Sequence, residues 1–172
     1  MLGAVAALLL CAYPALRAAD PPAVGTPAPN FKLTSQEGTP VSLSDFKGQW
    51  VVLYFYPKNF TKGCTIEAHN FQQDLAKYQQ IHAVILGVSV DTSDSHKEFC
   101  TKEGLNFKLL ADTDHSVSTT YGSTMLFGDK TFSARNTFLI DPKGTIVKEF
   151  IKVDPSKHSE EVLAALGDLQ KK

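Results

Sequence analysis

Cys64 lies where a predicted strand, a loop and a helix meet. Residues 50–56 are an unbroken apolar run rich in β-branched and aromatic side chains, which is typical of a strand buried on both faces of a parallel sheet. Pro57 ends this run. Apolar residues then recur at three- or four-residue spacing between Ala68 and Tyr78, so we expect a helix to begin close to Cys64.

A cysteine at a helix N-terminus is placed for thiolate chemistry. The first N–H groups of a helix have no partner within it, and the macrodipole favours negative charge at that end. The thiolate is the nucleophilic form of cysteine, so this position indicates a reactive Cys64. Lys58 and Lys62 flank the loop, but exposed lysines contribute little once salt screens them. The alternative is a buried structural thiol, because free cysteine is among the most buried residue types.

The other elements predict an α/β fold with a mixed central sheet. Strands are expected within residues 83–90, 107–110, 136–140 and 145–151, and an N-terminal β-hairpin is expected within residues 31–43. Helices are expected around residues 95–104, 114–121 and 162–169. In the first of these helices, Ser95 and Glu98 have capping-box spacing and Gly104 suits the C-terminal end. Parallel strand-helix-strand units followed by an antiparallel hairpin predict helices on both sides of the sheet.

Composition limits the classes of function. The chain has 172 residues, a formal net charge of −1 and a pI of about 6.5. This length suggests one domain, and the charge gives no reason to expect nucleic acid or an anionic membrane as a partner. No Gly-rich phosphate loop follows a strand, and no Cys/His spacing resembles a zinc site. We therefore expect neither a metal nor another cofactor.

The N-terminus resembles a targeting segment. Residues 1–19 are predicted to be a signal peptide, residues 20–26 a linker, and residues 27–172 the folded domain. An apolar core is followed by small residues before Asp20, although no Lys or Arg precedes that core. We therefore expect an exported protein in the periplasm or another extracytoplasmic compartment, free of the membrane once the signal is removed. An uncleaved anchor or an organelle lumen is the alternative.

Two separated motifs resemble one protein family. Pro57, Thr61 and Cys64 form P-x-x-x-T-x-x-C directly after a hydrophobic strand, which resembles the active-site loop of peroxiredoxins. The stretches YFYPK and GCTIEA are most similar to the bacterioferritin-comigratory, or Q-type, branch. Arg135, in RNTFLIDPKG, is similar to the second active-site segment of that family. The likeness extends over residues 25–169 and implies a thioredoxin-like fold, in agreement with the α/β pattern.

The resemblance implies a thiol-dependent peroxidase that reduces hydrogen peroxide and small organic hydroperoxides. Cys64 would be the peroxidatic cysteine. Many Q-type members carry a resolving cysteine five residues later, where this chain has His69, but others carry it on the next helix, as Cys100 does here. A Cys64–Cys100 disulfide reduced by a thioredoxin-like protein is therefore implied. The alternative is a one-cysteine enzyme in which Cys100 is a bystander.

The same resemblance gives roles to four further residues. Arg135, the one arginine besides Arg17, would bind the peroxide oxygen together with backbone N–H groups around Gly63. The Thr61 hydroxyl would orient the peroxide and Pro57 would shield Cys64 from water. An ordinary turn threonine and a simple strand terminator are the alternatives. Apart from the resemblance, Glu67 lies three residues after the cysteine on the same side of the helix, and either bonds to loop or arginine groups or is solvated.

Other functions make different demands on the sequence. A thioredoxin-like disulfide oxidoreductase requires Cys-x-x-Cys, whereas Cys64 is followed by Thr, Ile and Glu. A redox sensor without turnover, or a thioredoxin-fold binding module with a structural Cys64–Cys100 disulfide, stays open, because an even cysteine pair in an exported chain is commonly structural. We expect a monomer in either case.

Overall fold

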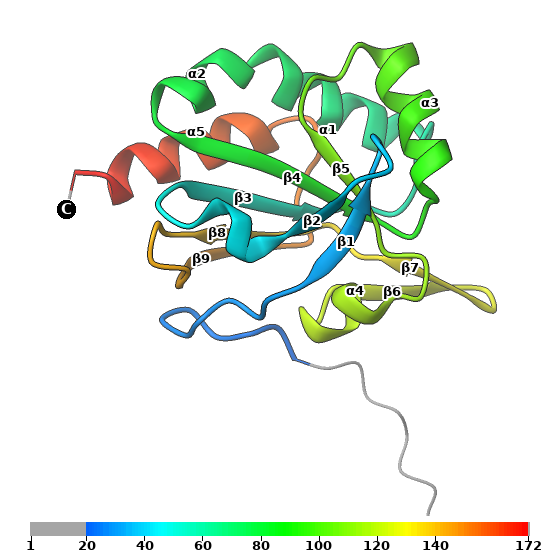
Figure 1. Cartoon of the computed structure of the whole chain (residues 1–172), viewed down its shortest axis with the longest axis horizontal. Coiled ribbons are helices and arrows are strands. Elements are labelled where there is room, and N and C mark those ends of the chain that lie inside the picture. The colour runs from blue at the N-terminus through cyan, green and yellow to red at the C-terminus, as the bar shows by residue number, and fades with distance from the viewer. Residues whose placement is uncertain (1–19, 172) are drawn as a thin grey trace, which may run out of the picture.

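A seven-stranded mixed sheet forms the centre of the molecule (Figure 1). The computed structural model describes residues 20–171, and residues 1–19 of the predicted signal lie outside this range. The strands of the sheet are β1 (Lys32–Ser35), β2 (Pro40–Ser42), β3 (Trp50–Phe55), β4 (Ala83–Ser89), β5 (Lys108–Ala111), β8 (Asn136–Ile140) and β9 (Ile146–Ile151). Their order is β2-β1-β5-β4-β3-β8-β9, in which β3, β4 and β5 are parallel and the remaining pairs are antiparallel.

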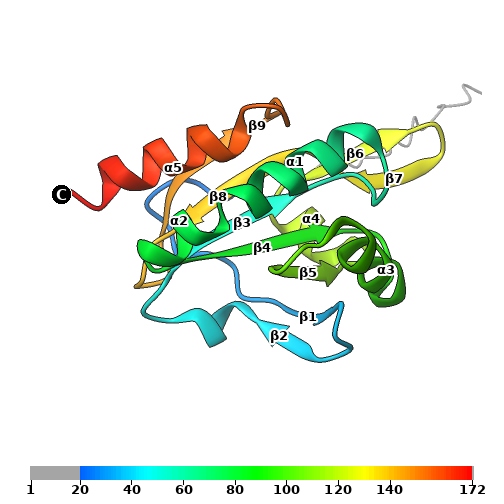
Figure 2. The same cartoon turned by 90° about the horizontal axis from the view of Figure 1, so that it is seen from above.

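Helices cover both faces of the sheet. They are η1 (Leu43–Phe46), α1 (Lys62–Gln73), α2 (Leu75–Gln80), α3 (Ser93–Glu103), α4 (Ser116–Thr120) and α5 (His158–Leu169). Figures 1 and 2 show α1 and α5 side by side over one face, with α2 beside them, while α4 lies across the opposite face. The predicted α/β fold, with a mixed sheet, flanking helices and an N-terminal β-hairpin formed by β1 and β2, is confirmed.

Strand β3 supplies the core of both layers. Val52 and Tyr54 belong to the hydrophobic cluster beneath α1, α2, α3 and α5, whereas Val51, Leu53 and Phe55 belong to the cluster beneath α4. All five are at most 2% exposed. Side chains alternate across a strand, so the continuous apolar run is explained by burial on both faces. The loop that follows β3 therefore starts from one of the most constrained positions in the fold.

Two helix boundaries differ from the prediction. The helix expected to continue from Cys64 to Tyr78 is broken at Asp74, whose carboxylate accepts a hydrogen bond from Ser159 Oγ of α5 at 2.8 Å. The capping box predicted at Ser95 is wrong, because Thr92 is the N-cap and its hydroxyl accepts the Ser95 N–H at 3.2 Å. Gly104 ends α3, as predicted, and its backbone is left-handed there (φ 67°).

A second sheet was not predicted. Strands β6 (Thr124–Phe127) and β7 (Lys130–Ser133) form an antiparallel hairpin that projects from the edge of the molecule (Figures 1 and 2). Gly128 in its turn has a positive φ of 64°. A Gly-Asp turn between two β-rich runs is the signal that identifies such a hairpin in the sequence. Its functional consequence is that β7 leads directly into the segment that carries Arg135.

The N-terminal segment packs against the domain before β1 begins. Within the predicted linker, the Gly25 N–H donates to Ile146 O at 2.7 Å, and Thr26 O accepts the Ile146 N–H at 3.0 Å. Between residues 20 and 171, no helix is long and apolar enough to cross a membrane.

Candidate active site

Cys64 lies in the first turn of α1, as predicted. Thr61 is the N-cap residue, with an extended backbone (φ −82°, ψ 146°), and its carbonyl accepts the Thr65 N–H at 2.9 Å. The N–H groups of the first helical residues, up to that of Cys64, precede this first bond and have no carbonyl one turn earlier to bind. Cys64 itself is only 2% exposed. The thiol is thus buried beside unpaired N–H donors that favour negative charge.

Arg135 reaches Cys64 from the segment between β7 and β8. Its Nη2 donates toward Cys64 Sγ at 3.2 Å. The backbone of the arginine is held in place because its carbonyl accepts the Val153 N–H at 3.1 Å. A fixed guanidinium at this distance stabilises a thiolate over a thiol, since it supplies both a positive charge and a donor. The fold therefore brings together the two residues that the sequence motifs singled out separately.

Glu67 is the third member of this group. Its Oε2 accepts Arg135 Nη1 at 2.7 Å, and its side chain is 1% exposed. Burial raises the pKa of Glu67 and the attraction of Arg135 lowers it. The effect of burial is the greater, so the pKa is raised to about 7. Glu67 and Cys64 are three residues apart on one face of α1, so a single arginine contacts both. Of the two alternatives for Glu67, bonded or solvated, the structure therefore has the bond to Arg135. Its three-residue spacing from Cys64 was the only sequence feature that pointed to this bond.

Glu67 should make stability depend on pH near neutrality. Its folded-state pKa of about 7 lies above the ordinary carboxyl value, so its stabilising contribution is complete in acid and is lost as pH rises through 7. We expect Glu67→Gln to reduce the loss of unfolding free energy between pH 5 and pH 8 by about 1–3 kcal/mol relative to the wild type. Urea unfolding at the two pH values measures this change in free energy. An identical loss of unfolding free energy in the variant and the wild type would contradict the raised pKa of Glu67.

Gly63 leaves room for the guanidinium. A Cβ atom at this position would lie 2.8 Å from Arg135 Nη2 and 3.6 Å from Pro155 Cγ. The guanidinium would have to move away, and its hydrogen bond to Cys64 Sγ would be lengthened or lost. We expect Gly63→Ala to lower the rate of Cys64 oxidation by roughly 10- to 100-fold, because small misplacements of catalytic groups have effects of this size. Stopped-flow oxidation by hydrogen peroxide measures that rate.

Gly167 provides the matched control for this substitution. It lies in α5, and a Cβ there meets no atom within 4 Å. Alanine favours both helices by about 1 kcal/mol per residue over glycine, so both variants should fold. Equal oxidation rates in Gly63→Ala and Gly167→Ala would show that crowding of Arg135 is without effect.

Among the described residues, the other two loop residues of the motif form no hydrogen bond to the sulfur. The Thr61 hydroxyl is exposed and donates to Lys58 O at 3.0 Å, which leaves its oxygen free to accept a further bond. Pro57 is half-buried and follows Tyr56, whose N–H bonds to Val88 O at 3.0 Å beside the end of β3. Thr61 is the N-cap of the helix of Cys64 and Pro57 begins the loop, so both shape the backbone that leads to the sulfur.

Cys100 lies on α3, in the hydrophobic cluster that also contains Cys64. Both thiols are free and buried. Burial, with a smaller effect from Glu37, raises the pKa of Cys100 to about 11. Cys100 is therefore a protonated, poorly nucleophilic thiol in this conformation.

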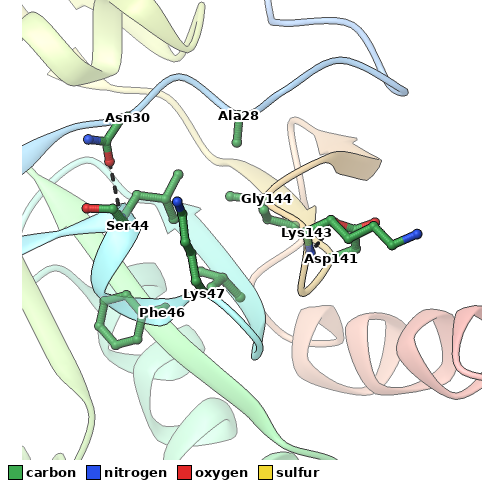
Figure 3. Close-up of a pocket in the computed structure, with 11 residues that line it drawn as sticks. Ala28, Asn30, Ser44, Phe46, Lys47, Asp141, Lys143 and Gly144 are labelled. Carbon is green, nitrogen blue, oxygen red and sulfur yellow. Dashed lines mark hydrogen bonds between the residues drawn. The ribbon is translucent and has the colours of Figure 1, made fainter.

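A pocket of about 270 Å³ lies away from the cysteines (Figure 3). Val51 and Ile140 contribute to its lining at the end of β3 opposite the Cys64 loop, and Lys47 and Lys143 also line it. No cysteine lines it, so the reaction site is the Cys64 group instead. Within residues 20–171, no group of three or more His, Cys, Asp and Glu side chains is arranged to hold a metal ion.

Known proteins are similar to this chain over most of its length. Residues 24–149 match the AhpC/TSA family. Peroxiredoxin Bcp of Bacillus subtilis is 40% identical over 153 residues, which covers 87% of this chain and 98% of the relative. The chain belongs to the AhpC/TSA family of peroxiredoxins. A Helicobacter pylori protein named as a putative peroxiredoxin Bcp is also 40% identical, over 83% of this chain and 97% of its own.

Solved peroxiredoxin structures agree with the fold and with the branch. A crystal structure of a PrxQ mutant from Xylella fastidiosa has a TM-score of 0.82 and 35% identity, and covers 86% of this chain and 97% of its own. The resemblance to the bacterioferritin-comigratory, or Q-type, branch and the thioredoxin-like fold are thus confirmed. This peroxiredoxin is a thiol-dependent peroxidase.

The comparison corrects the prediction of export. The Bacillus and Helicobacter relatives are matched over 98% and 97% of their own lengths, although only 87% and 83% of this chain is used. These relatives therefore have no room for a counterpart of a secretory segment, and placement in an extracytoplasmic compartment is not supported. The prediction was based on an apolar core followed by small residues, in a segment without the basic residues that normally begin a signal peptide.

Proposed function

We propose that Cys64 is the peroxidatic cysteine of this peroxidase and that Cys100 resolves it through an intramolecular disulfide. The observation that carries the proposal is the 3.2 Å contact between Arg135 Nη2 and Cys64 Sγ at the N-terminus of α1. A cation and a set of helix N–H groups converge on one buried sulfur. Such a site favours the nucleophilic thiolate and also the negative charge that develops when a peroxide bond breaks.

In the first step, the Cys64 thiolate attacks the terminal oxygen of a hydroperoxide. An S–O bond forms, the O–O bond breaks, and the leaving alkoxide or hydroxide takes a proton from solvent to give alcohol or water. The cysteine, oxidised by two electrons, becomes a sulfenic acid. Arg135 and the first-turn N–H groups near Gly63 stabilise the leaving oxygen, and the free lone pair of Thr61 accepts a hydrogen bond from the peroxide O–H.

In the second step, the Cys100 thiolate attacks the Cys64 sulfur. An S–S bond forms and hydroxide leaves with the proton of Cys100 as water. The raised pKa of Cys100 is a consequence of its burial, so its reactivity increases when α3 opens. Two electrons from an external dithiol then return both cysteines to thiols.

Hydrogen peroxide and small alkyl hydroperoxides are the proposed substrates, and a thioredoxin-like protein is the proposed reductant. A bacterioferritin comigratory protein from Xanthomonas campestris, whose solved structure is 35% identical over 80% of this chain, has alkyl peroxide reduction activity. A structural Cys64–Cys100 disulfide is less well supported, because both cysteines are free thiols. The reaction needs no cofactor, since thiol and peroxide exchange all the electrons.

Cys100→Ser separates the two steps. We expect this variant to consume its first equivalent of hydrogen peroxide at the wild-type rate, within about twofold, and to lose at least about 90% of its steady turnover with thioredoxin and thioredoxin reductase. Stopped-flow oxidation by hydrogen peroxide measures the first rate, and NADPH oxidation coupled through thioredoxin reductase measures the turnover. Wild-type turnover in the variant would show that Cys100 is a bystander.

A further inference from the structure

Large apolar side chains remain exposed around the end of the molecule that carries Cys64. In residues 20–171, five of the seven exposed large hydrophobic side chains belong to segments that flank Cys64 or lead to Arg135. These five are Phe60, Ile66, Met125, Leu126 and Phe127. Figures 1 and 2 both place the β6–β7 hairpin at the end of the sheet where α1 begins. Exposed apolar side chains that gather beside a reaction site indicate a binding surface.

The tip of the β6–β7 hairpin is the most exposed part of this surface. Leu126 and Phe127 are 74% and 75% exposed, the two highest values among the large hydrophobic side chains of the described residues. Successive side chains point to opposite faces of a strand, so the tip carries an apolar side chain on each face. Neither side chain belongs to the two hydrophobic clusters of the core. Packing of the fold therefore does not account for them.

The base of the hairpin is anchored to the domain. Ser133, at the end of β7, is fully buried, and its hydroxyl lies 2.8 Å from the Ser118 hydroxyl of α4. The Ala134 N–H donates to Ser123 O at 2.8 Å, which extends the hairpin by one further hydrogen bond. The next residue is Arg135 of the reaction site. A protein bound at the tip would thus be held in a defined place relative to that site.

The proposed reaction requires a protein at this end of the molecule. A protein dithiol reduces the Cys64–Cys100 disulfide only through direct contact between sulfur atoms. One partner thiolate attacks a sulfur of the disulfide, so a mixed disulfide forms and the other cysteine leaves as a thiolate. The second partner thiolate then attacks the mixed disulfide and releases this chain. Two electrons pass from the partner, which becomes a disulfide, and the two protons of its thiols end on Cys64 and Cys100.

The size of the apolar surface fits a transient partner better than a permanent one. If a fully exposed large side chain offers about 200 Å², the five side chains offer roughly 500 Å² in total. A stable interface buries about 800 Å² on each partner and obligate dimers bury more, whereas redox partners lie at the low end of the range. A second copy of this chain, bound permanently at the tip, is therefore less well supported than a dithiol protein that dissociates after each turnover.

We propose that the tip of the β6–β7 hairpin, with Leu126 and Phe127, is the docking site for the protein dithiol that reduces the Cys64–Cys100 disulfide. The inference rests on the proposed function, which makes such a protein the reductant. The partner that fits has an apolar surface beside its reactive cysteine, hollowed so that it accepts side chains from both faces of the hairpin. Reduction by a small dithiol needs no such surface.

The test replaces both side chains of the tip in the full chain, as Leu126→Thr, Phe127→Thr, with Cys11→Ser in every protein so that two thiols remain. Threonine is polar and favours strands, and both positions are exposed, so the hairpin should fold. Val24→Thr is the matched control. Val24 is 51% exposed, but it lies in the N-terminal segment that bonds to the start of β9, at the opposite end of the sheet from the Cys64 loop.

Turnover is measured over a range of thioredoxin concentrations with thioredoxin reductase and NADPH, and separately with dithiothreitol. We expect kcat/KM for thioredoxin to fall about tenfold in the double variant, because two apolar side chains no longer lose water on binding. Dithiothreitol turnover and the stopped-flow rate of Cys64 oxidation should stay within about twofold, since neither depends on docking. Val24→Thr should match the wild type in all three assays.

A second measurement locates the contact itself. A thioredoxin with a single reactive cysteine is trapped as a mixed disulfide with the oxidised protein, and amide hydrogen exchange is compared with that of the free protein. Exchange at residues 124–133 should slow in the complex, because a bound partner shields the hairpin from water. Exchange around Val24 should not change.

The outcomes separate this docking site from the proposed function. Unchanged thioredoxin kinetics in the double variant, or unchanged exchange in the hairpin, would overturn the docking site and leave the peroxidase cycle intact. An equal fall with thioredoxin and dithiothreitol would show that the hairpin supports the reaction site instead. A wild-type dimer that dissociates in the double variant, measured by light scattering, would assign the tip to a second copy. Wild-type turnover with dithiothreitol but none with thioredoxin would overturn both the proposed reductant and its docking site.

Discussion

Replacing Cys64 with serine is expected to lower the peroxidase rate on the order of 10⁴-fold or more, the size of effect seen when an enzyme loses its nucleophile. A serine hydroxyl at the same helix terminus is not ionised at neutral pH and cannot form a sulfenic acid. Arg135 and Glu67 would remain in place, because their ion pair does not involve the sulfur. The rate is measured as hydrogen peroxide consumption with dithiothreitol as the reductant.

Cys100→Ser is the control for this loss. Dithiothreitol can reduce the Cys64 sulfenic acid directly, so the Cys100 variant should retain most of its activity in the same assay. Both cysteines are buried, and each substitution exchanges sulfur for oxygen, so the two proteins carry similar structural costs. Loss of activity in Cys100→Ser with retention in Cys64→Ser would reverse the assigned roles.

Replacing Arg135 with methionine should have the second greatest effect. Methionine keeps the length of the apolar stem but removes the charge and both donors that face Cys64 and Glu67. We expect the second-order rate of Cys64 oxidation to fall about 10²–10³-fold, as when one preorganised donor to developing charge is lost. Stopped-flow oxidation over a range of peroxide concentrations gives this rate.

The same substitution leaves Glu67 buried without its partner. A fall in rate could then reflect a disturbed fold, and the double variant Arg135→Met, Glu67→Gln separates the two causes. Glutamine cannot ionise, so the double variant avoids the cost of protonating an unpaired buried carboxylate and should regain part of the unfolding free energy lost in Arg135→Met. The oxidation rate should stay low. Recovery of the rate together with stability would mean that Arg135 is structural.

Much of the fold follows from local patterns. The apolar run at residues 50–56 predicts β3 because burial on both faces leaves no room for alternation. The spacing of apolar residues places the start of α1 near Cys64, and Gly104 marks the end of α3. The β6–β7 hairpin was missed although its Gly-Asp turn is visible, since its strands are short and partly exposed.

The site was harder to predict because its contacts join distant segments. Arg135 meets Cys64 across 71 residues, and only the family resemblance pointed to it. The sequence left Glu67 open, because spacing shows that it shares a face of the helix but not that this face is buried. The hydrogen bond between Asn59, in the loop before Cys64, and His96 of α3 was not predicted either. It spans 37 residues and depends on how α3 packs beside the loop, which no local pattern encodes.

Mass spectrometry after one equivalent of hydrogen peroxide decides which sulfur reacts. The full chain carrying Cys11→Ser should lose two hydrogens and gain an intramolecular Cys64–Cys100 bond. With Cys100→Ser added, a sulfenic acid trapped by dimedone should appear at Cys64, and with Cys64→Ser added, neither product should form. A wild-type protein whose Cys64 stays reduced while peroxide is consumed, or a sulfenic acid that appears only at Cys100, would contradict the proposed mechanism.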